Sequence, residues 1–234
     1  MKAQLHHIDS ETENIKTFWF KPEKPFRFSA GQFSELYLPH TRPDVRGEKR
    51  WFTISSSPRQ ELVSITTRIA PAQGSSFKQI LSQLRPGATV EFAEAMGDFV
   101  MPLDKTRPLI FIAGGIGLTP FLSMLAWLAD TNEQRNIKFM YAVRSEQDII
   151  FQDAFARANQ HVTIVVSDPS SAWGGERGAI TSDMILGIEQ PSPDSLIYLS
   201  GPEPMIEGIA NNLISSGTSI DQIVTEPFPG YSNT

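Results

Sequence analysis

The chain has 234 residues, of which 40% are hydrophobic and 20% are charged, so it is neither a disordered nor a fibrous protein. Its net charge of −6 opposes binding to nucleic acid or to an anionic membrane surface. The absence of cysteine excludes disulfides, thiolate metal sites and a cysteine-ligated iron–sulfur cluster on this chain.

The sequence shows neither an apolar run of the roughly 18 residues that a membrane span requires nor the apolar stretch of a signal peptide. We therefore expect a soluble, cytoplasmic protein that binds neither membranes nor nucleic acid. We also expect no metal site, because the four histidines lack metal-ligand spacing: His6, His7, His40 and His161.

The first half of the chain predicts an antiparallel barrel or sandwich. Its apolar residues form short alternating runs separated by turn clusters such as Ala30-Gly31. These runs predict strands at 15–20, 33–38, 51–54 and 62–67. One helix is predicted after Ser75 or Ser76, either of which can cap it, and before Pro86-Gly87, because these apolar residues have helical spacing: Phe77, Ile80, Leu81 and Leu84.

The second half predicts a parallel sheet with helices on both faces, because buried strands alternate with helices. The strands are predicted at 109–113, 137–143, 162–166, 196–200 and 222–226. The helices are predicted at 151–159, 181–187 and 203–216, and another helix is expected to have Thr119 as its cap and Pro120 at its first position. The change of pattern near 103–108 predicts two domains, 1–103 and 104–234.

A glycine-rich turn joins the first strand of the second half to its helix. Gly114, Gly115 and Gly117 allow backbone N–H groups to approach a phosphate, and the helix N-terminus adds a favourable dipole. Pro120 stands where the common dinucleotide fingerprint has its third glycine. A tight turn without a ligand is therefore the alternative.

A second turn, Ser200-Gly201-Pro202, also ends a strand and begins a helix. In a doubly wound sheet, the first and fourth strands of this half lie side by side. Both turns would then line one crevice at the carboxyl ends of the strands, and together they predict a dinucleotide site.

The first half offers two further candidate sites. A strand carrying Arg50, Trp51, Phe52 and Thr53 presents a guanidinium, aromatic rings and a hydroxyl, which suit a phosphate, a flat ring and a ring nitrogen. The stretch 74–78 begins a helix with two hydroxyls and a lysine, which suits an anion. The alternatives are an ordinary strand with an exposed arginine and a plain helix cap.

The order of six short motifs resembles the ferredoxin–NADP⁺ reductase superfamily over essentially the whole chain. The motifs are RWFT (50–53), GSSF (74–77), AMGDF (95–99), GGIGLTP (114–120), SGPEPM (200–205) and EPF (226–228). The resemblance implies an FAD-binding antiparallel Greek-key β-barrel over 1–103. It also implies an NAD(P)-binding α/β doubly wound parallel sheet over 104–234.

The resemblance also implies roles for individual residues. Arg50 would contact the FAD phosphates, Phe52 the isoalloxazine ring and Thr53 the flavin N5. The remaining FAD-binding residues would be Trp51, Thr66, Thr67, Arg68, Gly74, Ser75 and Ser76. The nicotinamide nucleotide would be bound by Gly114, Gly115, Gly117, Thr119, Arg144, Gly201, Pro202 and Met205.

The expected catalytic residues are Thr53, Ser200, Glu226 and Phe228. Ser200 stands where the family has a cysteine near the nicotinamide, and it can fill the same space and form a hydrogen bond. Either Phe228 or Tyr231 would cover the flavin. Phe228 is favoured because it keeps the two-residue spacing from Glu226.

The end of the second strand of this half bears on the choice of nicotinamide cofactor. Arg144, with Arg177, favours the 2′-phosphate of NADP(H), whereas Glu146 keeps NAD(H) open.

The predicted function is a flavoprotein oxidoreductase that passes hydride from NAD(P)H to FAD and electrons to a separate acceptor. That acceptor would be a small redox protein of ferredoxin or flavodoxin type, an oxygenase component or a small molecule. A free-flavin reductase and a non-catalytic flavin-binding sensor or regulatory subunit are the alternatives.

Overall fold

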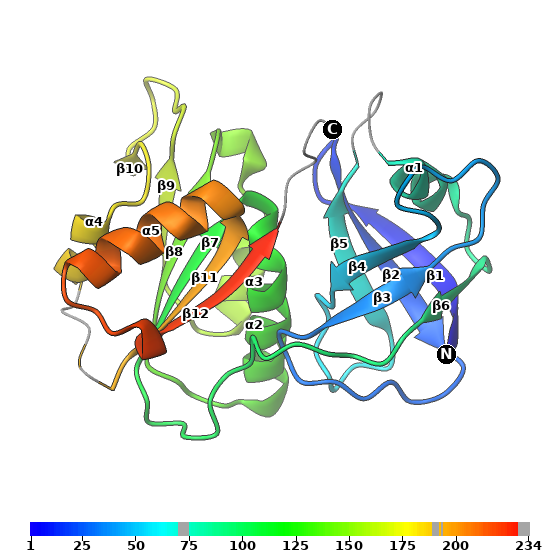
Figure 1. Cartoon of the computed structure of the whole chain (residues 1–234), viewed down its shortest axis with the longest axis horizontal. Helices are drawn as coiled ribbons and strands as arrows, with labels where there is room; N and C mark the ends of the chain where they lie inside the picture. Colours follow the sequence, from blue (N-terminus) through cyan, green and yellow to red (C-terminus); the bar gives the residue numbers. More distant parts are fainter. Residues whose placement is uncertain (70–74, 189–191, 193, 229–234) are drawn as a thin grey trace.

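The computed structural model describes residues 1–69, 75–188, 192 and 194–228. Within these residues the chain forms two six-stranded sheets, one from each half of the sequence (Figure 1). No helix among the described residues combines the length and apolar character needed to cross a membrane.

The first sheet is an antiparallel barrel with the strand order β4-β3-β6-β1-β2-β5. Its edges are brought together by an antiparallel bridge between Ile54 and Ile65. The strands are β1 (Lys2–Ser10), β2 (Ile15–Pro22), β3 (Phe33–Tyr37), β4 (Lys49–Thr53), β5 (Val63–Arg68) and β6 (Thr89–Phe92). Four of these confirm predicted strands, whereas β1 and β6 lie outside the predicted set.

Helix α1 (Ser76–Gln83) fills part of the barrel core. Its Phe77 and Leu81 are fully buried among strand residues such as Phe52, and each contributes about 1.5–3 kcal/mol of hydrophobic free energy. Ser75 caps the helix by accepting a hydrogen bond from the backbone N–H of Lys78, as predicted.

The second sheet is parallel throughout, with the order β10-β9-β8-β7-β11-β12. Its strands are β7 (Leu109–Gly114), β8 (Ile137–Val143), β9 (Val162–Val166), β10 (Glu176–Arg177), β11 (Leu196–Pro202) and β12 (Ile223–Phe228). The pairing of β7 with β11 confirms that the first and fourth predicted strands are neighbours. The two-residue β10 was not predicted.

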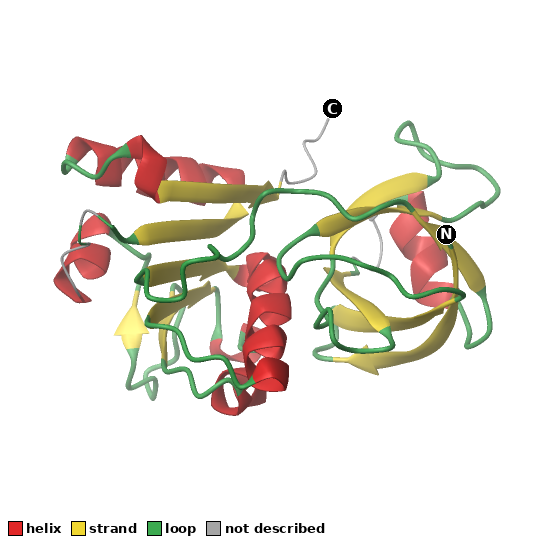
Figure 2. Ribbon diagram, turned by 90° about the horizontal axis from the view of Figure 1, so that it is seen from below, coloured by secondary structure: helices red, strands yellow, loops and turns green. Residues whose placement is uncertain are grey.

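Helices cover both faces of this sheet (Figures 1 and 2). Alternate residues of β7 point to opposite faces, so Phe111 packs with α2 (Thr119–Thr131) and α3 (Gln152–Arg157), while Ile112 packs with α4 (Ser182–Ile188) and α5 (Glu203–Ser215). The doubly wound α/β fold is therefore confirmed.

The predicted cap of α2 is wrong. Residues Gly115–Leu118 form a 3₁₀ turn, η1, and the residue that precedes the helix is Leu118. Thr119 is the first helical residue, and its backbone N–H and side-chain hydroxyl both bond to the carbonyl of Ile116. The tighter i to i+3 bonding of the turn uses these donors, so no side-chain cap is needed.

The barrel and the parallel sheet share a packed boundary, with α2 between them (Figure 2). The ring of Phe99 contacts those of Phe121 and Tyr198 with centroid distances of 5.4 and 5.1 Å. The hydroxyl of Ser123 donates to the carbonyl of Ser56 at 2.6 Å. Aromatic packing and this buried hydrogen bond hold the two halves together.

Candidate functional site

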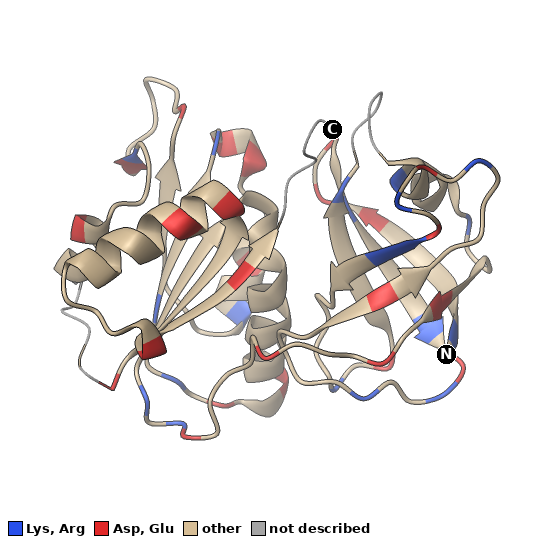
Figure 3. Cartoon of the chain, viewed as in Figure 1, with Lys and Arg blue, Asp and Glu red and all other residues tan. Residues whose placement is uncertain are grey.

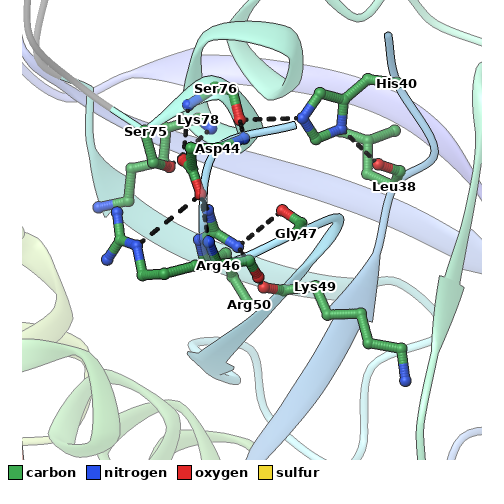
Figure 4. Close-up of polar contacts among 10 residues, drawn as sticks. All are labelled: Leu38, His40, Asp44, Arg46, Gly47, Lys49, Arg50, Ser75, Ser76 and Lys78. Atoms are coloured by element: carbon green, nitrogen blue, oxygen red, sulfur yellow. Dashed lines mark hydrogen bonds and ion pairs between the residues drawn. The ribbon is translucent and has the colours of Figure 1, made fainter. Parts of the chain in front are cut away.

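Arg50 and the N-terminus of α1 meet on the barrel at the side chain of Asp44 (Figure 4). Arg50 lies in the basic start of β4 (Figure 3), and its Nη2 donates to Oδ1 of Asp44 at 2.6 Å. The other oxygen of that carboxylate accepts from the backbone N–H of Ser76 at 3.0 Å. The predicted phosphate ligands Arg50 and Ser76, far apart in sequence, therefore meet on a single carboxylate.

The donors of Arg50 and Ser76 suit a negatively charged group. The Arg50 side chain is only 11% exposed, and its Nε is buried with no hydrogen-bond partner in the described part of the chain. Burial of Asp44 disfavours its charge, but the backbone N–H of Arg46 and the guanidinium of Arg50 outweigh this and hold its pKa below the usual value. The Asp44 carboxylate is an anion that these donors already bind, and a phosphate offers acceptor oxygens of the same kind.

The side chains of β4 divide between two surfaces. Arg50 lies 5.5 Å from the ring centroid of Phe77, and the ring of Phe52 lies 5.7 Å from that same ring. Trp51 is 54% exposed and contacts the edge of Phe33 instead. The structure therefore groups Arg50 with Phe52 and separates both from Trp51.

The hydroxyls of β4 and β5 differ in their partners. Thr53 is buried, and its hydroxyl makes no hydrogen bond to another described residue. Thr66 bonds to Thr17 and Ser55, both at 2.9 Å, and borders a cavity of about 400 Å³ between the barrel and helices α2 and α3. Thr53 can therefore accept or donate a bond to a ligand, whereas the hydroxyl of Thr66 is already used and only its backbone remains for the predicted role.

Two neighbours of Thr66 on β5 complete this edge of the barrel. Thr67 is buried, whereas Arg68 reaches across to the second domain, with its Nη2 3.6 Å from Oδ1 of Asp148. The turn η1 also contacts β5. The edge of β5 is therefore where the barrel meets the glycine-rich turn.

The two glycine turns of the second half pack directly against each other. A Cβ added to Gly117 would lie 2.4 Å from the carbonyl oxygen of Ser200 and 2.5 Å from the nitrogen of Gly201. Added to Gly114, it would lie 2.5 Å from Sδ of Met205. The predicted meeting of these turns is confirmed, and glycine is required for their close approach.

Gly115 serves a different purpose. Its φ of +53° lies in the left-handed region, and an added Cβ would meet no atom of the described part of the chain within 4 Å. Glycine here permits the backbone conformation of η1 rather than close packing.

Ser200 and Glu226 occupy the carboxyl end of the sheet and are register partners on β11 and β12. Ser200 is fully buried, and its Oγ has no hydrogen-bond partner among the described residues. Burial raises the pKa of Glu226 to about 7. Phe228 ends β12 beside Pro202, so a hydroxyl, a carboxyl that titrates near neutrality and an aromatic ring gather at one edge.

The end of β8 carries the residues predicted to distinguish the nicotinamide cofactors. Arg144 is exposed there. Glu146 accepts hydrogen bonds from the hydroxyl and the N–H of Ser170 at 2.7 and 3.0 Å, which hold its pKa below the usual value. Arg177 donates to the carbonyls of Ser170 and Trp173. Glu146 and Arg177 are thus held by one loop, and Arg144 projects from the strand end.

Some predicted residues cannot be placed, and one important residue was not predicted. Gly74 and Tyr231 lie outside the described residues. Asp44, which joins Arg50 to Ser76, lies in an irregular loop where no periodicity identifies a functional side chain. The signal that the sequence offers is that Asp44 is an acidic residue six positions before Arg50.

Comparisons with known proteins agree with this arrangement. The sequence model of the oxidoreductase NAD-binding domain matches residues 111–211. The chain is 32% identical over 240 residues to the glycine betaine monooxygenase reductase subunit of Chromohalobacter salexigens, covering 94% of this chain and 62% of that protein. It is 26% identical over 242 residues to the propane 2-monooxygenase reductase component of Rhodococcus jostii, covering 97% and 63%. The chain thus spans less than two thirds of these relatives.

Solved structures show the same fold. The FAD/NAD-binding domain of a nitric oxide dioxygenase from Vibrio cholerae has a TM-score of 0.83 at 21% identity, with 98% of each chain covered. A ferredoxin NADP⁺ reductase from Neisseria gonorrhoeae with bound FAD and NADP has a TM-score of 0.80 at 18% identity, covering 99% and 98%. The chain therefore shares the two-domain fold of these solved structures, and its second half is similar to the oxidoreductase NAD-binding domain.

Proposed function

We propose that the chain is an NAD(P)H-dependent flavoprotein reductase, with FAD held by residues 1–103 and the nicotinamide nucleotide by residues 104–234. The observation that carries this proposal is the pair of glycine turns that touch at the carboxyl ends of β7 and β11, with η1 in contact with β5 of the barrel. Ligands bind at such a switch point, and here it faces the barrel.

On the flavin side, the donor set fits a nucleotide phosphate. Arg50, whose Nε has no hydrogen-bond partner within the described ranges, and the N–H of Ser76 would hold the phosphates. Phe52 would contact the ring system. Thr53 would offer the flavin N5 its hydroxyl, which makes no hydrogen bond to another described residue. The supporting positions are Trp51, Thr66, Thr67, Arg68, Gly74 and Ser75. Bound FAD would supply the ability to accept a hydride and release electrons one or two at a time.

On the nicotinamide side, the residues would orient the nucleotide and manage one proton. The buried Oγ of Ser200 has no hydrogen-bond partner among the residues that the structure describes and would bond to the nucleotide. The carboxyl of Glu226 would hold or release a proton near neutral pH. Phe228, or Tyr231, would cover the flavin and exclude water. The turn itself would be shaped by Gly114, Gly115, Gly117, Thr119, Gly201, Pro202 and Met205.

We favour NADP(H) over NAD(H) because Arg144 is an exposed cation at the end of β8, whereas Glu146 is held by Ser170. A cytoplasmic location, where reduced nicotinamide cofactors are available, is part of the same proposal. We expect the electron acceptor to be a separate protein. The names of the relatives, which are reductase components of monooxygenases, support an oxygenase component in that role. A small redox protein is the second candidate.

The spectrum of the purified chain under anaerobic conditions tests the proposal. Loaded with FAD, it should be yellow and should bleach when NADPH is added, and a panel of acceptor proteins should restore the colour. Bleaching only of added free flavin would favour a flavin reductase. Colour that NADPH and NADH leave unchanged would favour a sensor, and no flavin binding would overturn the proposal.

A further inference from the structure

The loop between β3 and β4 holds Asp44 against the N-terminus of α1 (Figure 4). The Asp44 carboxylate accepts hydrogen bonds from the guanidinium of Arg50 and the N–H of Ser76. The backbone N–H of Asp44 also donates to Oγ of Ser76 at 2.9 Å. The donors proposed for a flavin phosphate are thus already bound to an anion that belongs to the chain.

Hydrogen bonds and one ring contact join this loop to the helix, with the ring centroids of His40 and Phe77 6.3 Å apart. Oγ of Ser76 lies 3.0 Å from Nε2 of His40, whose Nδ1 lies 2.8 Å from the carbonyl of Leu38. At the tip of the loop Val45 is fully exposed, so the tip buries no apolar side chain. An incoming anion that offers the same acceptors can therefore replace the tip that carries Asp44 without exposing a buried apolar side chain.

We propose that Asp44 is a specificity-determining residue that competes with the flavin phosphate for Arg50 and Ser76. This rests on the proposed function, because it assumes that the barrel binds a flavin nucleotide. Two anions cannot share these partly buried donors without strong repulsion. Phosphate must therefore displace the carboxylate, which lowers the affinity for FAD and keeps the flavin exchangeable.

The substitution Asp44→Asn distinguishes two possible roles of Asp44, which are competition with the phosphate for Arg50 and orientation of Arg50 toward the phosphate. The amide keeps the size of the side chain but removes its charge, so a competitor would be weakened. If Asp44 instead serves to orient Arg50 for the phosphate, the same substitution would weaken phosphate binding. Glu48→Gln is the matched control, because it removes a charge from the same loop on a side chain that bonds to the N–H of His40 and not to Arg50.

Calorimetric titration of the flavin-free chain with FAD, riboflavin and inorganic pyrophosphate tests the proposal. We expect Asp44→Asn to bind FAD and pyrophosphate about tenfold more tightly than the parent. Riboflavin, which has no phosphate, should bind to Asp44→Asn and to the parent with equal affinity. Glu48→Gln should bind all three ligands with the affinity of the parent. Asp44→Ser provides a second neutral variant should the first unfold at a lower temperature.

Weaker or unchanged binding of pyrophosphate and FAD by both neutral variants would overturn the proposal. An equal gain for riboflavin would also contradict it, because competition for phosphate cannot affect a ligand without one. If pyrophosphate binding tightens as expected while no flavin binds to any variant, the role of Asp44 as an internal anion holds and the proposed flavin function fails.

Discussion

Ser200 and Glu226 are direct neighbours on the parallel strands β11 and β12. The hydroxyl of Ser200 is buried without a partner in the described part of the chain, and burial raises the pKa of Glu226 to about 7. One residue therefore has an unused hydrogen-bonding group, and the other changes charge near neutral pH. Both lie at the edge where the two glycine turns meet.

The stability of the protein should fall as the pH rises toward 7 because of Glu226. Its folded-state pKa of about 7 lies above the ordinary value of 4.5, so the folded state binds the proton more tightly than the unfolded state does. The resulting stability is fully present below the unfolded-state pKa and is lost as the pH rises through the folded-state pKa.

Urea denaturation at about pH 5 and about pH 8 measures this effect. The difference in unfolding free energy should be smaller in Glu226→Gln, which is neutral at both values. The exposed Glu207, on α5, provides a control through Glu207→Gln, which should retain the parent's difference. Equal differences in the parent and Glu226→Gln would show that Glu226 titrates normally.

Arg50→Ala should weaken FAD binding. A charge-assisted hydrogen bond to a phosphate contributes about 1.5–3 kcal/mol, so a loss of more than tenfold in affinity is expected. Lys49→Ala is the matched control, because Lys49 is the neighbouring cation on β4 but pairs with Glu35 at 3.0 Å. Retention of FAD by the Arg50 variant, measured by fluorescence titration, would remove Arg50 from the site.

The strand patterns explain how much of this arrangement is predictable. The apolar run of β7 and the alternating runs of β2 and β5 identify their elements, and the motif order indicates both domains. In β1 only Ala3 and Leu5 are buried, and β6 has only four residues, so neither gives a clear pattern.

Contacts that depend on three-dimensional structure were not predictable. The pairing of Ser200 with Glu226 depends on strand register, and the contact of Asp44 with Arg50 depends on a loop conformation that local sequence does not determine. The expected cap at Thr119 was wrong because a 3₁₀ turn extends the helix by one turn at its start.

Gly117→Ala should impair nicotinamide binding and lower stability. The new methyl group would lie 2.4 Å from the carbonyl oxygen of Ser200 and force the two turns apart. Gly208→Ala lies in the exposed part of α5, where an added Cβ meets no described atom within 4 Å, and should instead raise stability by about 0.5–1 kcal/mol. Thermal unfolding and NADP⁺ titration of both variants check this contrast, and tolerance of Gly117→Ala would show that the turns need not touch.

Phe228→Ala should strengthen the binding of the nicotinamide nucleotide. A ring that covers the flavin competes with the nicotinamide for the same stacking position, and such contacts contribute about 0.5–1.5 kcal/mol. Titration with NADP⁺, followed through the flavin spectrum, should show tighter binding and slower turnover in this variant. Tyr231→Ala should have little effect. The reverse pattern would assign the covering ring to Tyr231.

The most direct test is the rate of FAD reduction in a single anaerobic turnover with NADPH, compared with NADPH deuterated at the transferred position. If the nucleotide at the glycine turns passes hydride to the flavin held by Arg50, the flavin absorbance should disappear within one turnover, and deuterium should slow this step. An FAD-loaded chain whose absorbance neither NADPH nor NADH changes would contradict the assignment of a reductase.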